Sequence, residues 1–297
     1  MTIHVGTGPV SWGVMEMDSW AARKPYCEVL DEMAAAGYTG TELGPYGYFP
    51  TDSKQLIDEL SSRGLTMVSG FVPVPLADRQ RHSIAIREVM KVARLLSEAG
   101  SRVIVLADEM NETRMAIAGR VGAEDEMDED AWRRAAEILT ELGHRCREIG
   151  LAAAFHAHAG TYVETPRELE RLCAATDPEL IGICIDTGHY YYGGGDPLDA
   201  VRRYKSRIRH LHLKDVRRSV LESVRRNGIG YLDAIRSGVF CELGEGAVNF
   251  RSVAEELEKA GFHGWGIYEQ DVDPAMAAAA SVSAIRSRQY LRRNVGI

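Results

Sequence analysis

The sequence lacks the cysteine spacings that build disulfide frameworks or zinc-thiolate sites. Its five cysteines are odd in number, widely scattered and free of any C-x-x-C pair. This usage fits a reducing compartment, so we expect a cytoplasmic protein. No window approaches the roughly 18 consecutive apolar residues of a membrane span, and MTIHVGTGPVSWG has no basic flank followed by a long apolar core. The sequence therefore predicts neither a membrane span nor a signal peptide.

An excess of positive charge is also missing. The formal net charge is -8 at pH 7, whereas nucleic-acid binding relies on clustered Lys and Arg. The G-x-S-x-G elbow of serine hydrolases is absent, and the glycines of YGGGDP lack the dinucleotide-binding pattern. We therefore expect a small molecule as the partner and no nucleic acid. Assembly into a homo-oligomer is compatible with the sequence.

The sequence does have a regular alternation of short apolar runs and longer amphipathic segments, most of which end at a glycine. Eight such units predict an α/β fold in which parallel strands close into a (β/α)8 TIM barrel. No long linker divides the chain, so residues 1–297 are expected to form a single domain. The expected strands are residues 3–10, 39–43, 66–72, 102–107, 152–158, 181–186, 209–214 and 265–269.

One segment breaks this rhythm. Between the seventh and eighth predicted strands, residues at about 216–249 insert roughly an extra helix and a Gly-rich loop. Long loops that follow the strands of a barrel commonly shape its active site. We therefore expect this insertion to lie beside the functional site.

Three of the predicted strands end on a side chain that can bind a divalent cation. They are Asp186 in ICIDTGH, His212 in RHLHLKD and Glu269 in WGIYEQD. The carboxyl ends of the strands in a parallel barrel meet on one face, so these side chains are expected to lie close together. A mixed oxygen and nitrogen ligand set suits Mn, Co, Mg or Zn better than a thiolate-loving ion. The sequence therefore predicts a metal site.

Each of these residues also has an interpretation without a metal. Asp186 could cap the helix that follows, His212 could be a satisfied core histidine, and Glu269 could lie in a solvated loop. His210, two residues before His212, shares its strand face. The carboxylates at the strand ends on either side of His212 favour the metal.

Further candidates stand at other strand ends. His156 and His158 share one face of the fifth strand, and Glu164 lies in the loop that follows, HAHAGTYVET. Each is a candidate for metal binding or proton transfer. Glu42, in TGTELG, and Trp12, after the first strand, could face a substrate, although a large aromatic near a barrel mouth can simply belong to the core.

Taken together, these motifs resemble a known family. The runs ICIDTGH, RHLHLKDVR, GEGAVNF and GWGIYEQDVDP are similar to the xylose isomerase-like barrel superfamily of sugar isomerases and epimerases. HAHAGTYVET, AAAGYTGTELG and the insertion after the seventh strand resemble the inosose dehydratase group within it. The resemblance covers the second strand and most of the chain beyond residue 150.

The resemblance implies a divalent metal, Mn or Co in the first place and Mg or Zn as alternatives, bound at the ends of strands five to eight. Epimerases place a Glu on strand five, where this chain has His156 at the similar position and Glu164 as the nearest carboxylate. We assign Glu164 as the fourth ligand, with His156 or His158 as alternatives. The expected ligands are Glu164, Asp186, His212 and Glu269.

The same resemblance implies lyase chemistry on an inosose or a similar cyclic keto-polyol, in which a base removes the proton next to the ketone and the β-hydroxyl leaves as water. An epimerase or isomerase that returns the proton to the opposite face is the alternative, and a metal-free sugar-binding barrel is a third. The expected catalytic residues are Glu164, Glu269, His158, His189 and Lys214. The expected substrate contacts are Trp12, Glu42, His156 and Lys214.

Overall fold

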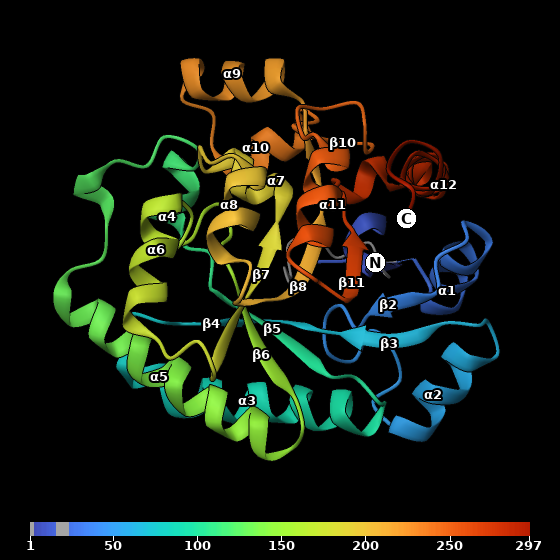
Figure 1. Cartoon of the computed structure of the whole chain (residues 1–297), viewed down its shortest axis with the longest axis horizontal. Helices are drawn as coiled ribbons and strands as arrows, with labels where there is room; N and C mark the ends of the chain where they lie inside the picture. Colours follow the sequence, from blue (N-terminus) through green and yellow to red (C-terminus); the bar gives the residue numbers. More distant parts are fainter. Residues whose placement is uncertain (1–2, 16–23) are drawn as a thin grey trace.

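The computed structural model describes residues 3–15 and 24–297, and its parallel strands lie at the centre of the molecule with helices around them (Figure 1). The strands form one sheet in the order β3-β2-β1-β11-β8-β7-β6-β5-β4. Their bounds are β1 Ile3–Thr7, β2 Gly40–Glu42, β3 Thr66–Ser69, β4 Phe71–Val74, β5 Val103–Asp108, β6 Ala152–His156, β7 Ile181–Asp186, β8 Ile208–Leu213 and β11 Gly264–Tyr268.

The first and last strands of this sheet are two halves of a single barrel strand. β3 pairs with β2, β4 pairs with β5, and only Gly70 separates the two halves. The backbone carbonyl of Gly70 still accepts a hydrogen bond from the amide of Val105 on β5. The sheet therefore returns on itself, and the prediction of an α/β barrel with eight strand positions is confirmed.

Several predicted strands are shorter than expected, and the first differs most. The strand expected over residues 3–10 ends at Thr7, and Pro9–Trp12 forms a short 3-10 helix. Pro9 stands at the start of this helix, where its missing N–H costs no hydrogen bond. The turn that follows therefore leaves the barrel directly after the first strand.

The helices cover the outside of the barrel, as their amphipathic patterns predict. α3 and α5, the two longest, pack against each other (Figure 1). None of the helices in the two described ranges combines the length and apolar character that crossing a membrane requires. Their bounds are α1 Tyr26–Ala35, α2 Ser53–Ser61, α3 Arg79–Glu98, α4 Glu112–Ile117, α5 Glu129–Glu148, α6 Pro166–Ala175, α7 Thr187–Tyr192, α8 Pro197–Tyr204, α9 Arg218–Asn227, α10 Tyr231–Arg236, α11 Phe250–Lys259 and α12 Ala280–Tyr290.

The insertion at residues 216–249 contains two helices, α9 and α10, where the sequence indicated one. β9 (Asp215–Val216) and β10 (Phe240–Cys241) pair in an antiparallel ribbon at its base. The carboxylate of Asp215 accepts hydrogen bonds from the amides of Gly244, Gly246 and Val248. A Cβ atom at Gly246 would lie 2.2 Å from Oδ1 of Asp215, so only glycine fits this loop. The base of the insertion is therefore fixed to the end of β8.

Candidate metal centre and active site

The carboxyl ends of the strands surround a cavity of about 310 Å³. This volume is at the lower end of the range for small-molecule sites and fits a compact substrate. Its apolar lining consists of Pro9, Val10, Val14, Met15, Phe71, Pro73, Met110 and Met115. Its ionisable lining consists of Glu42, Asp108, Glu109, His156, His158, His212, Lys214, Glu269 and Asp271.

Four side chains from four neighbouring strands meet beside this cavity, and three of them line it: His156, His212 and Glu269. His156 ends β6, Asp186 ends β7, His212 lies on β8, and Glu269 follows β11. Nε2 of His156 is 3.2 Å from Oδ2 of Asp186. Nδ1 of His212 is 3.6 Å from that same oxygen and 3.3 Å from Oε2 of Glu269. The three strand-end residues expected to bind a metal are thus brought together, with His156 as the fourth member.

The donor atoms of this group fit a divalent cation. The ligand atoms of His156, Asp186 and His212 all lie within 4.8 Å of one another. Among the described residues, Nδ1 of His212 is a buried nitrogen without a hydrogen-bond partner, although two carboxylates lie within 3.6 Å of it. A buried polar atom rarely lacks a hydrogen-bond partner unless it binds an ion or a ligand. Imidazole nitrogen and carboxylate oxygen together suit Mn, Co or Zn.

The charges around Asp186 keep its carboxylate ionised, as a ligand of a cation must be. Burial alone would raise the pKa of Asp186, but the charges of Lys214 and His189 and the bonds from nearby imidazoles hold it well below its ordinary value. Burial lowers the pKa of His156 to about 4, so its imidazole is neutral at pH 7. Asp186 and His156 are thus in the state that metal binding requires. Burial alone would lower the pKa of His212, but Cys184 and the carboxylates of Glu269 and Glu42 raise it well above its ordinary value, so a cation would replace a proton on that ring.

Asp186 also caps a helix. Its Oδ1 accepts a hydrogen bond of 2.7 Å from the amide of His189 in the first turn of α7, and Oδ2 faces the two histidines. The capping interpretation of the sequence and the metal interpretation therefore describe two different oxygens of one side chain. The hydrogen bond that Oδ1 accepts from α7 fixes the orientation of the carboxylate, and thereby the direction of Oδ2.

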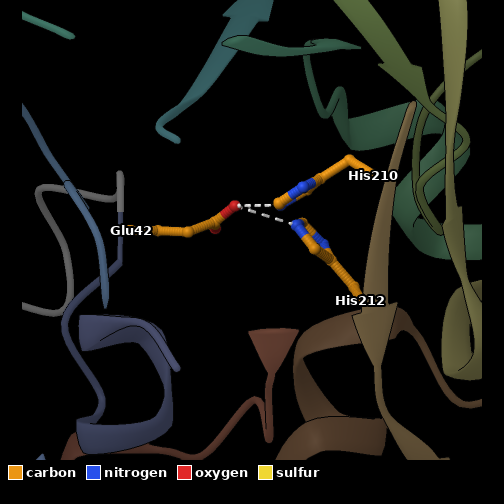
Figure 2. Close-up of side chains that lie close together, drawn as sticks. All are labelled: Glu42, His210 and His212. Carbon is orange, nitrogen blue, oxygen red and sulfur yellow. Dashed lines mark hydrogen bonds and ion pairs between the residues drawn. The ribbon is translucent and has the colours of Figure 1, made fainter. Parts of the chain in front are cut away.

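A second group of side chains lies on the other side of His212. Figure 2 shows Glu42 of β2 pointing at the rings of His210 and His212, which lie on one face of β8. Oε1 of Glu42 is 3.0 Å from Nε2 of His210 and 3.2 Å from Nε2 of His212. The hydroxyl of Ser69 donates to the same oxygen over 2.6 Å. Glu42 was expected to contact the substrate; it lines the cavity and also holds a residue of the metal group.

A third group contains Lys214 and two more histidines. Nζ of Lys214 lies 2.9 Å from Nε2 of His189 and 2.6 Å from Oδ1 of Asp271. The rings of His158 and His189 lie against each other, with centroids 3.8 Å apart. Burial alone would lower the pKa of Lys214, but Asp271 and the other nearby carboxylates raise it well above its ordinary value, so the ammonium stays charged. Lys214 and His158 line the cavity, and His189 lies behind them.

Glu164, which the sequence favoured as the fourth ligand, is placed differently. Its two carboxylate oxygens accept hydrogen bonds from the backbone amides of Gly119 (2.6 Å) and Gly160 (2.7 Å). In the described part of the chain it belongs neither to the cavity lining nor to any group of potential metal ligands. Burial raises its pKa to about 7. The side chain orders the loop that carries His158, whose amide bonds to Val163.

Trp12 is also not among the described residues that line the cavity. It is 2% exposed, and its indole N–H donates to Oε2 of Glu32 on α1 over 2.7 Å. This contact places it in the core, which was the alternative interpretation of a large aromatic at this position.

Two further residues of the site had a partial signal in the sequence, and a third had none. His210 stood two residues before His212, and Asp271 followed Glu269 closely, but neither was assigned a role. Tyr231, whose hydroxyl donates to Oδ2 of Asp271 over 2.9 Å, lies in the insertion and had no motif of its own. Only the folded chain brings it to the barrel.

Comparison with known proteins identifies the family. A family model described as Xylose isomerase-like TIM barrel matches residues 30–292. The chain belongs to this family. Its fold is that of the IOLI protein, whose crystal structure with a bound zinc atom matches with a TM-score of 0.72 at 14% identity, covering 99% of this chain and 98% of that one.

Two relatives are similar over most of their length. The chain is 33% identical over 301 residues to an inosose dehydratase of Geobacillus thermodenitrificans (strain NG80-2), covering 99% of this chain and 98% of the relative. It is 34% identical over 277 residues to the rhizopine catabolism protein MocC of Rhizobium meliloti, covering 93% and 84%. The chain is therefore an enzyme of a sugar isomerase and dehydratase family, with buried groups that fit a divalent metal.

Proposed function

We propose that this chain is a metal-dependent lyase that dehydrates a cyclic keto-polyol, with an inosose (2-keto-myo-inositol) as the substrate. The observation that carries the proposal is the convergence of His156, Asp186, His212 and Glu269 beside a small cavity that Lys214 also lines. Relatives about one-third identical over nearly their whole length are inosose dehydratases, which supports the choice of substrate.

We propose these four residues as the metal ligands, with His156 in place of Glu164. His156 ends β6 beside Asp186, whereas both oxygens of Glu164 are already engaged by backbone amides. The set contains two nitrogen and two oxygen donors, which favours Mn or Co and also accommodates Zn or Mg. Glu269 faces the cavity as well, so it can serve the cation and the substrate together.

A cation bound there would supply positive charge that stabilises the negative charge developing on the ketone oxygen of the substrate. The chain itself supplies the proton acceptors. Glu269 and His158 both line the cavity, and burial lowers the pKa of His158 well below its ordinary value. Nδ1 of His158 lies 2.7 Å from the carbonyl oxygen of Ala159, which accepts a hydrogen bond from Nδ1–H and leaves Nε2 as the base.

The reaction then balances within this site. The base takes the proton from the carbon next to the ketone, and the electron pair of that C–H bond forms a C=C bond as the C–O bond to the β-hydroxyl breaks. The charged ammonium of Lys214 donates a hydrogen bond to the departing oxygen. The proton held by the base joins that oxygen, so one water and an unsaturated ketone leave an unchanged enzyme.

Keto-sugar epimerisation or isomerisation is the second candidate. It needs a proton acceptor on each side of the reacting carbon, and Glu269 and His158 are two separate acceptors on the cavity wall. In this reaction the proton returns to carbon and no oxygen leaves. The dehydratase is preferred because Lys214 places a charged donor beside these groups, where a departing oxygen would need it.

Mass spectrometry of the products separates the candidates. The metal-loaded protein is incubated with scyllo-inosose and with a panel of ketohexoses, and chelated protein serves as the control. Loss of the mass of one water from the inosose, abolished by chelation and restored by Mn or Co, is the expected result. Isomers of unchanged mass would establish the epimerase instead. If the substrates are unchanged and the protein binds no metal, the remaining candidate is a metal-free sugar-binding barrel.

A further inference from the structure

Lys214 is the one buried lysine among the six in the chain, all of which lie in the described residues. A buried ammonium requires hydrogen-bond acceptors that face it. Oδ1 of Asp271 is the nearest, at 2.6 Å, and Oε2 of Glu269 lies at 3.1 Å. The carboxylate of Asp186 also faces the ammonium, at 3.6 Å, so three carboxylates surround its three N–H donors and the one that is best fixed sets the direction of the group.

Asp271 is fixed by the insertion. Its second oxygen, Oδ2, accepts the hydrogen bond of the Tyr231 hydroxyl over 2.9 Å. Tyr231 is the first residue of α10, and both side chains are almost completely buried. Because one oxygen binds Lys214 and the other binds Tyr231, the carboxylate is held at both ends.

Apolar side chains of the insertion also pack around the network of Lys214, Asp271 and Tyr231. Tyr231 and Phe240 belong to a second apolar cluster, separate from the main barrel core, that contains most of the buried side chains of α9 and α10. Nζ of Lys214 lies 5.2 Å from the centre of the Phe240 ring. An ammonium surrounded in this way is shielded from bulk water and keeps one direction.

We propose that Asp271 and Tyr231 are positioning residues that hold the Lys214 ammonium toward the substrate, so that the inserted segment 216–249 completes the active site. The inference rests on the function proposed above, in which Lys214 donates to the departing oxygen. It assigns the insertion a role in the reaction rather than in binding the metal, because the hydroxyl of Tyr231 donates to Asp271, which is not one of the four proposed ligands.

A purely structural role explains the network less well. Desolvating two charges costs free energy that apolar packing of the same volume would not, so a buried ion pair is a poor way to stabilise a fold. Here the ion pair of Asp271 and Lys214 connects Tyr231 of the insertion to a charged group on the cavity wall. A hydrogen-bond donor held in a fixed position on the cavity wall can stabilise charge that develops on a bound substrate.

The chain offers a matched pair of variants. Tyr231→Phe keeps the ring and removes the hydroxyl that binds Asp271. Tyr192→Phe is the control, because Tyr192 lies in the same cluster, with ring centroids 5.8 Å apart, and its buried hydroxyl has no hydrogen-bond partner in the described chain. Asp271→Asn, which keeps the volume and removes the charge, is the second test variant.

The first measurement observes the ammonium directly. In the full-length, zinc-loaded protein with isotopically labelled lysine, a fixed and buried ammonium exchanges its protons slowly enough to give a proton–nitrogen correlation signal. Exposed lysines do not, and Lys214→Met assigns the signal by its loss. We expect the signal in wild type and Tyr192→Phe, and its loss in Tyr231→Phe and Asp271→Asn.

The second measurement follows turnover of scyllo-inosose. Tyr231→Phe should lower kcat about 10-fold with KM and metal affinity nearly unchanged, Asp271→Asn should lower kcat further, and Tyr192→Phe should match wild type. A wild-type ammonium signal or wild-type kcat in Tyr231→Phe would overturn the proposal, as would equal losses in both tyrosine variants. If wild type turns over no inosose, the proposed function fails, and the ammonium signal alone decides the positioning role.

Discussion

Nε2 of His212 lies 3.2 Å from Oε1 of Glu42, deep inside the barrel. The other ring nitrogen, Nδ1, faces Asp186 and Glu269. A carboxylate that accepts a hydrogen bond from one imidazole N–H orients the ring and directs the other nitrogen toward a metal. The position of Glu42 therefore explains why His212 presents Nδ1 to the proposed cation.

Glu42→Gln should weaken metal binding without removing a ligand. The amide loses the negative charge that holds Nε2 of His212, so we expect the affinity for Mn or Co to fall about 10 to 100-fold, as is typical for a residue that orients a ligand. Competition titration against a chelator measures the change. An affinity equal to that of wild type would show that the contact between Glu42 and His212 does not influence metal binding.

His156→Ala and Glu164→Gln distinguish the two candidates for the fourth ligand. We expect His156→Ala to lose metal and activity together, since Nε2 of His156 faces Asp186. Glu164→Gln should retain the metal, because its oxygens bind backbone amides. Elemental analysis after dialysis measures both. The opposite outcome, with metal lost only in Glu164→Gln, would restore Glu164 as the ligand.

Glu164 should also make the stability of the protein depend on pH. Burial raises its pKa from 4.5 to about 7, so the native state binds more protons than the unfolded state between these values. The contribution of Glu164 to the free energy of unfolding is therefore greatest below pH 4.5. It is lost as the pH rises through 7, which lowers the free energy of unfolding by up to roughly 3 kcal/mol.

Glu164→Gln cannot ionise and should lack this contribution. Urea unfolding of both proteins at pH 5 and pH 8 gives the comparison, with the free energy of unfolding of wild type falling more steeply than that of the variant. Parallel changes in the two proteins would mean that Glu164 is already ionised at pH 5 in the native state.

The strands and their terminal side chains could be predicted from the sequence because both are local features. An apolar run fixes a buried strand, and the alternation of side chains along β8 places His210 and His212 on one face. Closure of the barrel then brings Asp186, His212 and Glu269 together. No knowledge of the loops is needed for that step.

The residues whose surroundings the sequence did not predict depend on contacts between distant segments. Glu164 follows a strand closely, but its carboxylate turns to the amide of Gly119, 45 positions earlier in the chain. Trp12 bonds to Glu32 on another helix, and Tyr231 reaches Asp271 only because the insertion folds back over the barrel. No periodicity or motif encodes such pairings, since each is decided by packing.

Calorimetric titration of metal-free protein with Mn, in wild type and Asp186→Asn, tests the metal centre most directly. Asn caps a helix about as well as Asp, so the variant should keep the hydrogen bond to the amide of His189 and the melting temperature of wild type. We expect one tightly bound Mn per wild-type chain and none in the variant. No binding in wild type, or equal binding in both proteins, would contradict this prediction.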